Sequence, residues 1–328
     1  MKISVVIPVY NAAAYLEGAL RSVVAAAART DAAVEVVCVD DGSTDASGAM
    51  LDAFAAQNAS GALAVRVIHQ PNGGEGSARN AGLAVATGEW VTFLDADDLW
   101  LSNILTSFVG ACERNADAEI VSFGLTWFED GMPPPNGEDG PSSSRPFDIA
   151  REIPSDVAFA VGIAPTFFRR ELVQGVRFNT LPLGADRVYV AQCLVRASCV
   201  VVSDAKVYAY RRRSGSMSSL RWDARKVESL VDYASESIRI FAESEKEVGR
   251  EWRKYLANVL LKVAKRHLRN LPESDRVRLL PRWRTACGAI PAADMPLASR
   301  LFRRWRGHPE ACDFHPERDD CGKGKRET

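Results

Sequence analysis

The sequence predicts an α/β protein with a Rossmann-like, mostly parallel sheet and flanking helices. Four short apolar segments rich in β-branched residues, at 3–8, 34–39, 65–69 and 90–94, have the length of buried strands. Helical patterns separate them at nearly even spacing, which is typical of right-handed βαβ crossovers. Polar residues follow three of the four strands, and ligands bind at the carboxyl ends of such strands.

The first two helices have recognisable starting residues. Asn11 follows the first strand and suits an N-cap position. Thr44 or Asp45 suits the N-cap of the second helix, which we expect at 46–57. These polar residues therefore have a structural interpretation beside any functional one.

Three carboxylates, Asp95, Asp97 and Asp98, directly follow the fourth strand. Carboxylates this close repel one another, and a bound divalent cation would relieve that repulsion. A water-exposed turn ahead of a helix near Ser102 would relieve it as well. Because polar groups after the earlier strands should meet at the same edge of the sheet, we favour the cation.

Two common nucleotide-binding signatures are absent. A dinucleotide site needs a glycine-rich turn after the first strand, where this chain has Val9-Tyr10-Asn11. The phosphate loop G-x-x-x-x-G-K-[ST] does not occur. The sequence therefore argues against a nicotinamide cofactor and excludes a phosphate loop of this type.

Composition indicates a soluble globular protein of 328 residues, 47% hydrophobic and 25% charged. Its seven cysteines are scattered, no signal peptide precedes the first strand, and no apolar run is long enough to span a bilayer. These features predict a cytoplasmic location. We expect no nucleic-acid partner.

The net charge of −1 conceals a strongly basic region at 250–306, which holds 15 Lys or Arg and 4 Asp or Glu, a net charge of +11. Aromatic residues are interleaved with these charges at Trp252, Trp283, Phe302 and Trp305. This pattern suits peripheral contact with the anionic inner face of a membrane. Solvated helices with their aromatic residues in the core explain the pattern equally well.

Four motifs in order, Val5–Asn11, Val39–Asp45, Asn72–Gly82 and Phe93–Asp98, make the sequence recognisable. Together they resemble the family 2 glycosyltransferases of the GT-A fold. The resemblance is strong over about the first 125 residues and continues more weakly to Ser216.

The resemblance implies an inverting transfer of a sugar from a nucleotide diphosphate, commonly UDP, to a hydroxyl of a saccharide or lipid-linked acceptor. A polysaccharide or glycoconjugate would be the product, and Mn²⁺ or Mg²⁺ the cofactor. Residues 1–125 would bind the nucleotide sugar, and 126–220 would hold the acceptor and the catalytic residue of the same domain. We expect a helical, basic C-terminal region at 221–306 and a disordered tail at 307–328.

The resemblance also assigns the donor and metal residues. Asp41 would contact uracil, with Asp40 supporting its turn. Asp95 and Asp97 would form the metal site, with Asp98 as a third candidate ligand. Asp95 would belong to the donor site as well, and seven further positions complete that site: Pro8, Tyr10, Asn72, Gly74, Ala96, Arg211 and Ser216.

Two charged residues have a structural alternative. The resemblance places Arg79 beside the nucleotide, whereas the structural alternative is a charged side chain on a helix surface. It makes Asp186 the general base, whereas Asp186 could merely cap the helix expected at 187–196. The family often has a Glu-Asp pair where this chain has Ala185 and Asp186, so half of the pair is missing.

Other functions remain open at this point. A non-catalytic homologue that binds sugar nucleotides would explain the missing Glu at Ala185. A nucleotidyltransferase that makes sugar nucleotides is less favoured, because it usually needs a basic, glycine-rich loop after the first strand, and this chain has none there.

Overall fold

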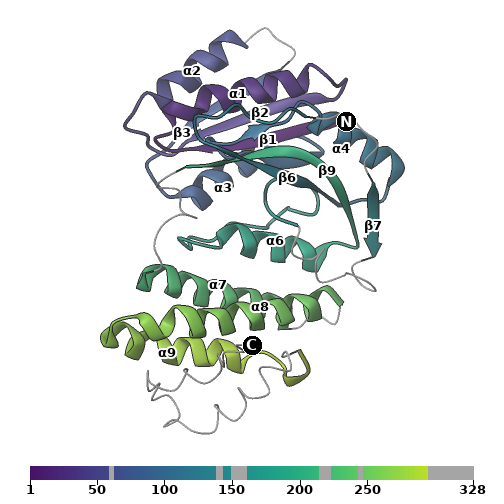
Figure 1. Cartoon of the computed structure of the whole chain (residues 1–328). Helices are drawn as coiled ribbons and strands as arrows, with labels where there is room; N and C mark the ends of the chain where they lie inside the picture. The colour runs from purple at the N-terminus through teal and green to yellow at the C-terminus, as the bar shows by residue number, and fades with distance from the viewer. Residues whose placement is uncertain (59–62, 138–142, 149–160, 214–222, 243–246, 295–328) are drawn as a thin grey trace, which may run out of the picture.

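The computed structural model describes residues 1–58, 63–137, 143–148, 161–213, 223–242 and 247–294. Helices lie on both faces of one central sheet, and further helices stack below it (Figure 1). The predicted α/β class is therefore confirmed. The helices are α1 (Ala13–Ala27), α2 (Ser47–Gln57), α3 (Glu75–Val85), α4 (Ile104–Arg114), α6 (Ala185–Arg196), α7 (Ala224–Ala242), α8 (Glu247–Arg266) and α9 (Glu273–Gly288).

The sheet has the order β3-β2-β1-β4-β8-β6-β9-β5, and β7 pairs with β9 outside this path. Its first four members pair in parallel, as the βαβ alternation predicts. The strands are β1 (Lys2–Val9), β2 (Ala33–Asp40), β3 (Ala64–His69), β4 (Trp90–Phe93), β5 (Leu99–Trp100), β6 (Ile120–Glu129), β7 (Ser144–Asp148), β8 (Thr166–Arg169) and β9 (Cys199–Arg212).

The second half of the sheet mixes strand directions. β8 is antiparallel to both β4 and β6, whereas β6 and β9 are parallel. The strand that we expect around Cys199–Val202 continues to Arg212, with irregular register between Ser122 and Leu125 on its partner β6. Because β9 is this long, its last residues reach the edge of the sheet at which β4 ends.

Asn11 does not cap the first helix. Its backbone is left-handed at φ 48°, the N-cap residue is Ala12, and no side chain caps that position. The Asn11 Oδ1 instead accepts hydrogen bonds from the backbone N–H groups of Thr44 and Asp45, at 2.8 and 3.3 Å. The amide thus joins the turn after β1 to the turn after β2.

Two apolar cores lie on opposite faces of the sheet. One is shared by the strands with α1, α2 and α4, and includes Leu16 and Phe108. The other combines the opposite strand face with α3, α6 and the C-terminal helices, and includes Phe93, Tyr189 and Trp252. Because this second core is continuous from the sheet to α9, the C-terminal helices are packed onto the α/β unit (Figure 1).

The aromatic residues of the basic region do not form a membrane-binding surface in the part of the chain that is described. Trp252 and Trp283 are buried, and the Trp283 indole donates to the Leu260 carbonyl at 2.9 Å. They belong to the helical core, so the alternative explanation of the pattern holds for both. Phe302 and Trp305 lie outside the described residues. Among the helices that are described, none is long and apolar enough to cross a membrane.

Candidate active site

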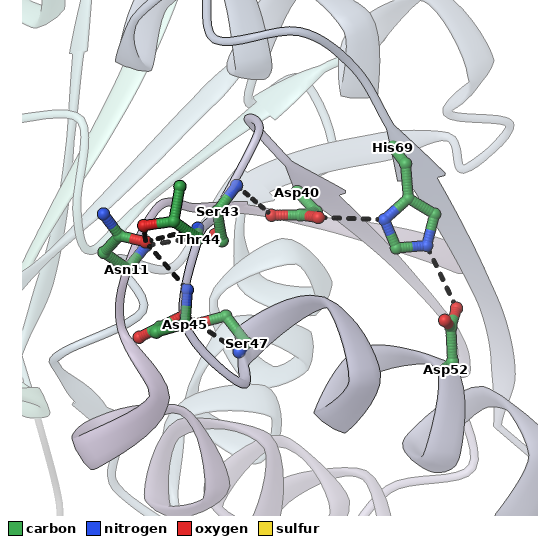
Figure 2. Close-up of polar contacts among 8 residues, drawn as sticks. All are labelled: Asn11, Asp40, Ser43, Thr44, Asp45, Ser47, Asp52 and His69. Atoms are coloured by element: carbon green, nitrogen blue, oxygen red, sulfur yellow. Dashed lines mark hydrogen bonds and ion pairs between the residues drawn. The ribbon is translucent and has the colours of Figure 1, made fainter.

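The turn after β2 is built by a network of short polar contacts (Figure 2). Asp40 Oδ1 accepts the Ser43 backbone N–H at 3.0 Å, and its Oδ2 lies 2.9 Å from Nδ1 of His69. The other ring nitrogen of His69 lies 3.0 Å from Asp52 on α2. Asp40 therefore supports the turn, as expected, and His69 ties it to β3 and α2.

This network shifts the pKa values of its members. Burial would raise the pKa of Asp40, but hydrogen bonds from Ser43 and His69 outweigh it and lower that pKa. Hydrogen bonds to Asp40 and Asp52 raise the pKa of His69 above its usual value. A protonated imidazole donates from both ring nitrogens, which suits its position between two carboxylates.

Asp45 joins the turn before α2 to both α1 and α2. Its Oδ1 accepts the Ser47 backbone N–H at 2.9 Å, and its Oδ2 accepts the Ala13 N–H of α1 at 3.0 Å. The N-cap residue of α2 is Ala46, so the prediction of Thr44 or Asp45 at that position is wrong. Asp45 stabilises the first turn from one residue earlier.

Asp41 organises the glycine-rich loop before α3. Its carboxylate is buried and accepts the Gln70 side-chain amide at 2.6 Å and the backbone N–H groups of Gly73 and Gly74 at 3.0 and 2.8 Å. A carboxylate offers about four lone-pair sites, so one remains for a ligand donor. Gly74, at φ +84°, is the N-cap of α3 in a conformation that favours glycine.

Arg79 is a buried junction between carboxylates. Only 2% of it is exposed, and its Nη2 donates to Glu75 Oε1 at 2.6 Å and to Asp95 Oδ1 at 2.7 Å. Its guanidinium also stands 5.4 Å from the ring centre of Phe178. Burial would lower the pKa of Arg79, but the charges of Glu75, Asp95 and Asp186 raise it. The surface-charge alternative is wrong for this residue.

The three carboxylates after β4 differ in their surroundings. The side chains of Asp95 and Asp97 are each 27% exposed, whereas Asp98 is 2% exposed. Asp98 accepts the Tyr208 hydroxyl and the Arg211 backbone N–H, both at 2.8 Å. Burial and the neighbouring charges of Asp95 and Asp97 raise the pKa of Asp98 to about 8. Asp98 therefore bonds the turn after β4 to β9. Asp95 and Asp97 are the more accessible carboxylates.

Two arginines at the end of β9 lie against Asp97. Arg213 Nε donates to Asp97 Oδ2 at 2.8 Å, and Arg211 Nε donates to the Asp97 backbone carbonyl at 2.8 Å. Both guanidinium groups face the ring of Tyr15, at 5.1 and 5.2 Å from its centre. Arg211, a predicted donor residue, is thus at the acidic cluster.

Asp186 lies in the first turn of α6 and is partly buried. The N-cap of this helix is Gly184, at φ +88°, so Asp186 is not the cap residue. Its negative charge raises the pKa values of both Glu75 and Arg79. The chain therefore brings Asp186 near the groups that follow β3 and β4, although more than 90 residues separate it from Asp95 in the sequence.

The remaining predicted residues lie along the same edge or beyond the described chain. Pro8 is buried within β1, Tyr10 directly after it is exposed, and Asn72 is exposed in the loop before α3. Ala96 is buried between Asp95 and Asp97. Ser216 lies outside the described residues.

Residues 4–171 match the family model of glycosyl transferase family 2. The chain belongs to this family. It is 33% identical over 245 residues to the glycosyltransferase GlyG of Streptococcus pneumoniae, across 72% of this chain and 79% of that protein. This family 2 glycosyltransferase also resembles solved structures of low sequence identity, which show the fold.

One such structure is S. aureus TarS 1–349 in complex with UDP-GlcNAc, with a TM-score of 0.68 and 23% identity over 90% of this chain and 83% of that one. Another is the mannosyltransferase PcManGT of Pyrobaculum calidifontis in complex with GDP-Man and Mn²⁺. Its TM-score is 0.54 at 18% identity, over 93% of this chain and 83% of that one. The fold of the family 2 glycosyltransferase is therefore the GT-A fold.

The described residues of this glycosyltransferase contain no group of three or more His, Cys, Asp or Glu side chains that could hold a metal on their own. Mg²⁺ is often bound by only one or two carboxylates together with substrate phosphates. Asp95 and Asp97, which are partly exposed carboxylates at one strand end, fit that smaller set. Their oxygen ligands also suit Mn²⁺.

Two residues of the site, Glu75 and Tyr208, are not predicted from the sequence. Glu75 stands inside the recognised loop motif, four residues before Arg79, and that spacing is the signal for their ion pair. Tyr208 and Arg213 approach Asp98 and Asp97 only through pairing of β9 with the rest of the sheet. No local pattern indicates those contacts.

The Arg79 junction predicts a large loss of stability on Arg79→Met. Arg79 itself is buried, whereas the side chains of its partners Glu75 and Asp95 are 60% and 27% exposed, so the loss of its two charge-assisted hydrogen bonds should cost about 2 kcal/mol. The matched control is Arg21→Met, because Arg21 pairs with Glu17 at the same spacing on an exposed helix face and should cost below about 0.5 kcal/mol. Urea unfolding measures both, and equal losses would contradict the junction.

The His69 bridge predicts a stability that depends on pH. Because the pKa of His69 is raised in the folded state, its contribution is fully present below the unfolded value of about 6.5 and is lost as pH rises through the folded pKa. The melting temperature of His69→Gln should fall below that of the wild type most strongly near pH 5.5, and the difference should shrink at pH 8.5. A difference that grows with pH would refute this assignment.

Proposed function

We propose that this family 2 glycosyltransferase transfers a sugar from a UDP-sugar to an acceptor hydroxyl, with inversion, in the synthesis of a polysaccharide or glycoconjugate. The observation that carries the proposal is the Arg79 junction. There the guanidinium that holds Asp95 lies over Phe178, and Phe178 stacks on Tyr189 of α6, the helix that carries Asp186. This packing supports one reaction that uses Asp186 as the base and the acidic cluster as the donor site.

Uracil recognition is assigned to Asp41. After its three contacts with the loop, the carboxylate has room for one more hydrogen bond. The imide N–H of uracil is a donor, whereas cytosine and adenine have an acceptor nitrogen at the corresponding place. TarS, which was solved with UDP-GlcNAc, supports UDP, and PcManGT, solved with GDP-Man, makes GDP the alternative to test.

The diphosphate is assigned to the edge between β4 and β9. Arg211 and Arg213 bring two guanidinium groups to Asp97, and guanidinium groups pair well with phosphate oxygens. Asp95 and Asp97 would hold Mn²⁺ or Mg²⁺ together with the diphosphate. When bound, the cation would stabilise the negative charge that grows on the leaving diphosphate.

Asp186 is assigned as the general base. The acceptor oxygen attacks C1 of the sugar, the bond from C1 to the diphosphate oxygen breaks, and UDP leaves with that electron pair. The acceptor proton passes to the Asp186 carboxylate as the new glycosidic bond forms. Because attack and departure occur on opposite faces of the sugar, the configuration at C1 inverts.

A non-catalytic sugar-nucleotide binder is the second candidate, and Ala185 is the observation that favours it. Such a binder would take up a UDP-sugar without releasing UDP. Thermal shift against UDP, GDP, CDP and dTDP with Mn²⁺ identifies the nucleotide. UDP release from UDP-GlcNAc and other UDP-sugars, with p-nitrophenyl glycosides as acceptors, then separates the enzyme from the binder.

Asp97→Ala should abolish most UDP release and weaken UDP binding in Mn²⁺, because it removes one of two accessible carboxylates from the cation. Asp31→Ala is the control, since Asp31 is exposed before the amino end of β2, at the opposite edge of the sheet. Calorimetric binding and UDP release measure the two effects. Full turnover of the wild type in excess EDTA would refute metal dependence.

Asp186→Asn should reduce transfer by at least about 10²-fold, because the amide keeps the shape of the side chain but cannot accept the proton. UDP affinity should stay near that of the wild type, and the melting temperature should change little. Asp275→Asn is the matched control, because Asp275 also lies in the first turn of a helix, α9. Near-normal transfer by Asp186→Asn would remove Asp186 as the base.

A further inference from the structure

Helix α6, which carries Asp186, lies between the sheet and α7 (Figure 1). On the sheet side it is fixed by Tyr189, one turn after Asp186. The Tyr189 ring stacks on Phe178 at 4.0 Å with an interplanar angle of 3°, and meets the edges of Phe93 and Phe168 at 5.8 and 5.7 Å. This face of α6 is therefore held by an aromatic cluster.

On the other side, the start of α6 is held by Tyr233 of α7. A Cβ atom on Gly184 would lie 2.9 Å from both Cβ and Cγ of Tyr233, a distance that real side chains do not reach. The side chain of Tyr233 is thus packed directly on the backbone of Gly184, two residues before Asp186. Tyr233 is 2% exposed, so no solvent layer separates the two helices at this point.

The pKa of the Tyr233 hydroxyl agrees with this packing. Burial is the main cause that raises it, Tyr255 raises it next, and the charge of Asp186 raises it further, while Arg187 opposes the shift. The packing of the ring on Gly184 is the observation that places Tyr233 at the first turn of α6.

Helix α7 is itself anchored from the C-terminal side. Arg282 of α9 forms ion pairs with Glu228 and Asp232 of α7, and Arg278 pairs with Glu228 at 2.6 Å. Asp232 directly precedes Tyr233 in the chain. The position of Tyr233 therefore depends on how α9 holds α7.

We propose that Tyr233 is a positioning residue for Asp186, which makes the C-terminal helices part of the machinery for sugar transfer. The proposal rests on the proposed function of Asp186 as general base. A base must reach the acceptor proton at about 2.6–3.2 Å, and a shift of 1 Å can cost about 10²-fold in rate. Aromatic packing on both faces of α6 keeps the first turn within that tolerance.

Tyr233→Ala tests the inference, with UDP-GlcNAc as donor and p-nitrophenyl glycosides as acceptors. We expect kcat to fall by about 10- to 10²-fold, while the affinity for UDP and Mn²⁺ is unchanged. Tyr233→Phe keeps the ring and should restore kcat to within about twofold of the wild type. A fall in UDP affinity that equals the fall in kcat would contradict a positioning role.

Phe241→Ala is the matched control. Phe241 is equally buried on α7, but it packs on Trp252 of α8, at 5.4 Å between ring centres, and not on Gly184. Both alanine variants should lower the melting temperature, since each removes a buried aromatic ring. Only Tyr233→Ala should lower kcat, and an equal loss of kcat in both variants would assign the effect to general loosening of the core.

Backbone hydrogen exchange in the full chain provides a measurement that needs no turnover. The Val188 N–H donates to the Gly184 carbonyl at 3.0 Å, and its exchange should accelerate in Tyr233→Ala more than in Phe241→Ala. Equal exchange in the two variants would refute the inference whatever the activity. If instead the wild type releases no UDP from any donor while this difference in exchange is found, the proposed function fails and the packing stands.

Discussion

The buried guanidinium of Arg79 is the interaction on which the rest of the site depends. It joins Glu75, at the start of α3, to Asp95, after β4, and its face lies over Phe178. Phe178 in turn stacks on Tyr189 of α6. Phe178 therefore connects Arg79, and through it Asp95, with the helix that carries Asp186. The guanidinium is buried and would be costly without these carboxylates, whereas Glu75 and Asp95 keep part of their side chains exposed. The geometry of the site is thus part of the stability of the fold.

Much of the structure of residues 1–125 could be predicted from the sequence, because its signals are local. The four parallel strands are recognisable in the sequence as apolar segments. The polar residues after them meet at one edge because parallel strands share a direction. Asp45 accepts the first N–H of α2, but from one residue before the N-cap Ala46. The local pattern of Asn11 predicts a cap, whereas its amide joins two loops with the backbone at φ 48°. A long-range contact prevailed over a local propensity.

The described structure after residue 125 could not be predicted to the same extent, because the contacts there come from strand and helix packing. The pairing of β9 brings Tyr208 and Arg213 to the acidic cluster, and no residue near them in the chain indicates it. Asp98 has the same residue type as Asp95 and Asp97 but a different role, which depends on burial against β9. The interleaved aromatic and basic residues of the C-terminal region suggested a membrane surface, yet Trp252 and Trp283 belong to the core. In that region the helical period was the better signal.

The proposed reaction is a one-step displacement at C1 between the acidic cluster after β4 and Asp186. Its most direct test needs no knowledge of the natural acceptor, because water can replace the acceptor in slow hydrolysis of UDP-α-GlcNAc. Proton NMR of the first turnovers, recorded before mutarotation, distinguishes the two anomers of the released sugar by the coupling of H1. The account predicts that β-GlcNAc appears first with the wild-type chain and Mn²⁺. Initial release of the α-anomer would contradict it.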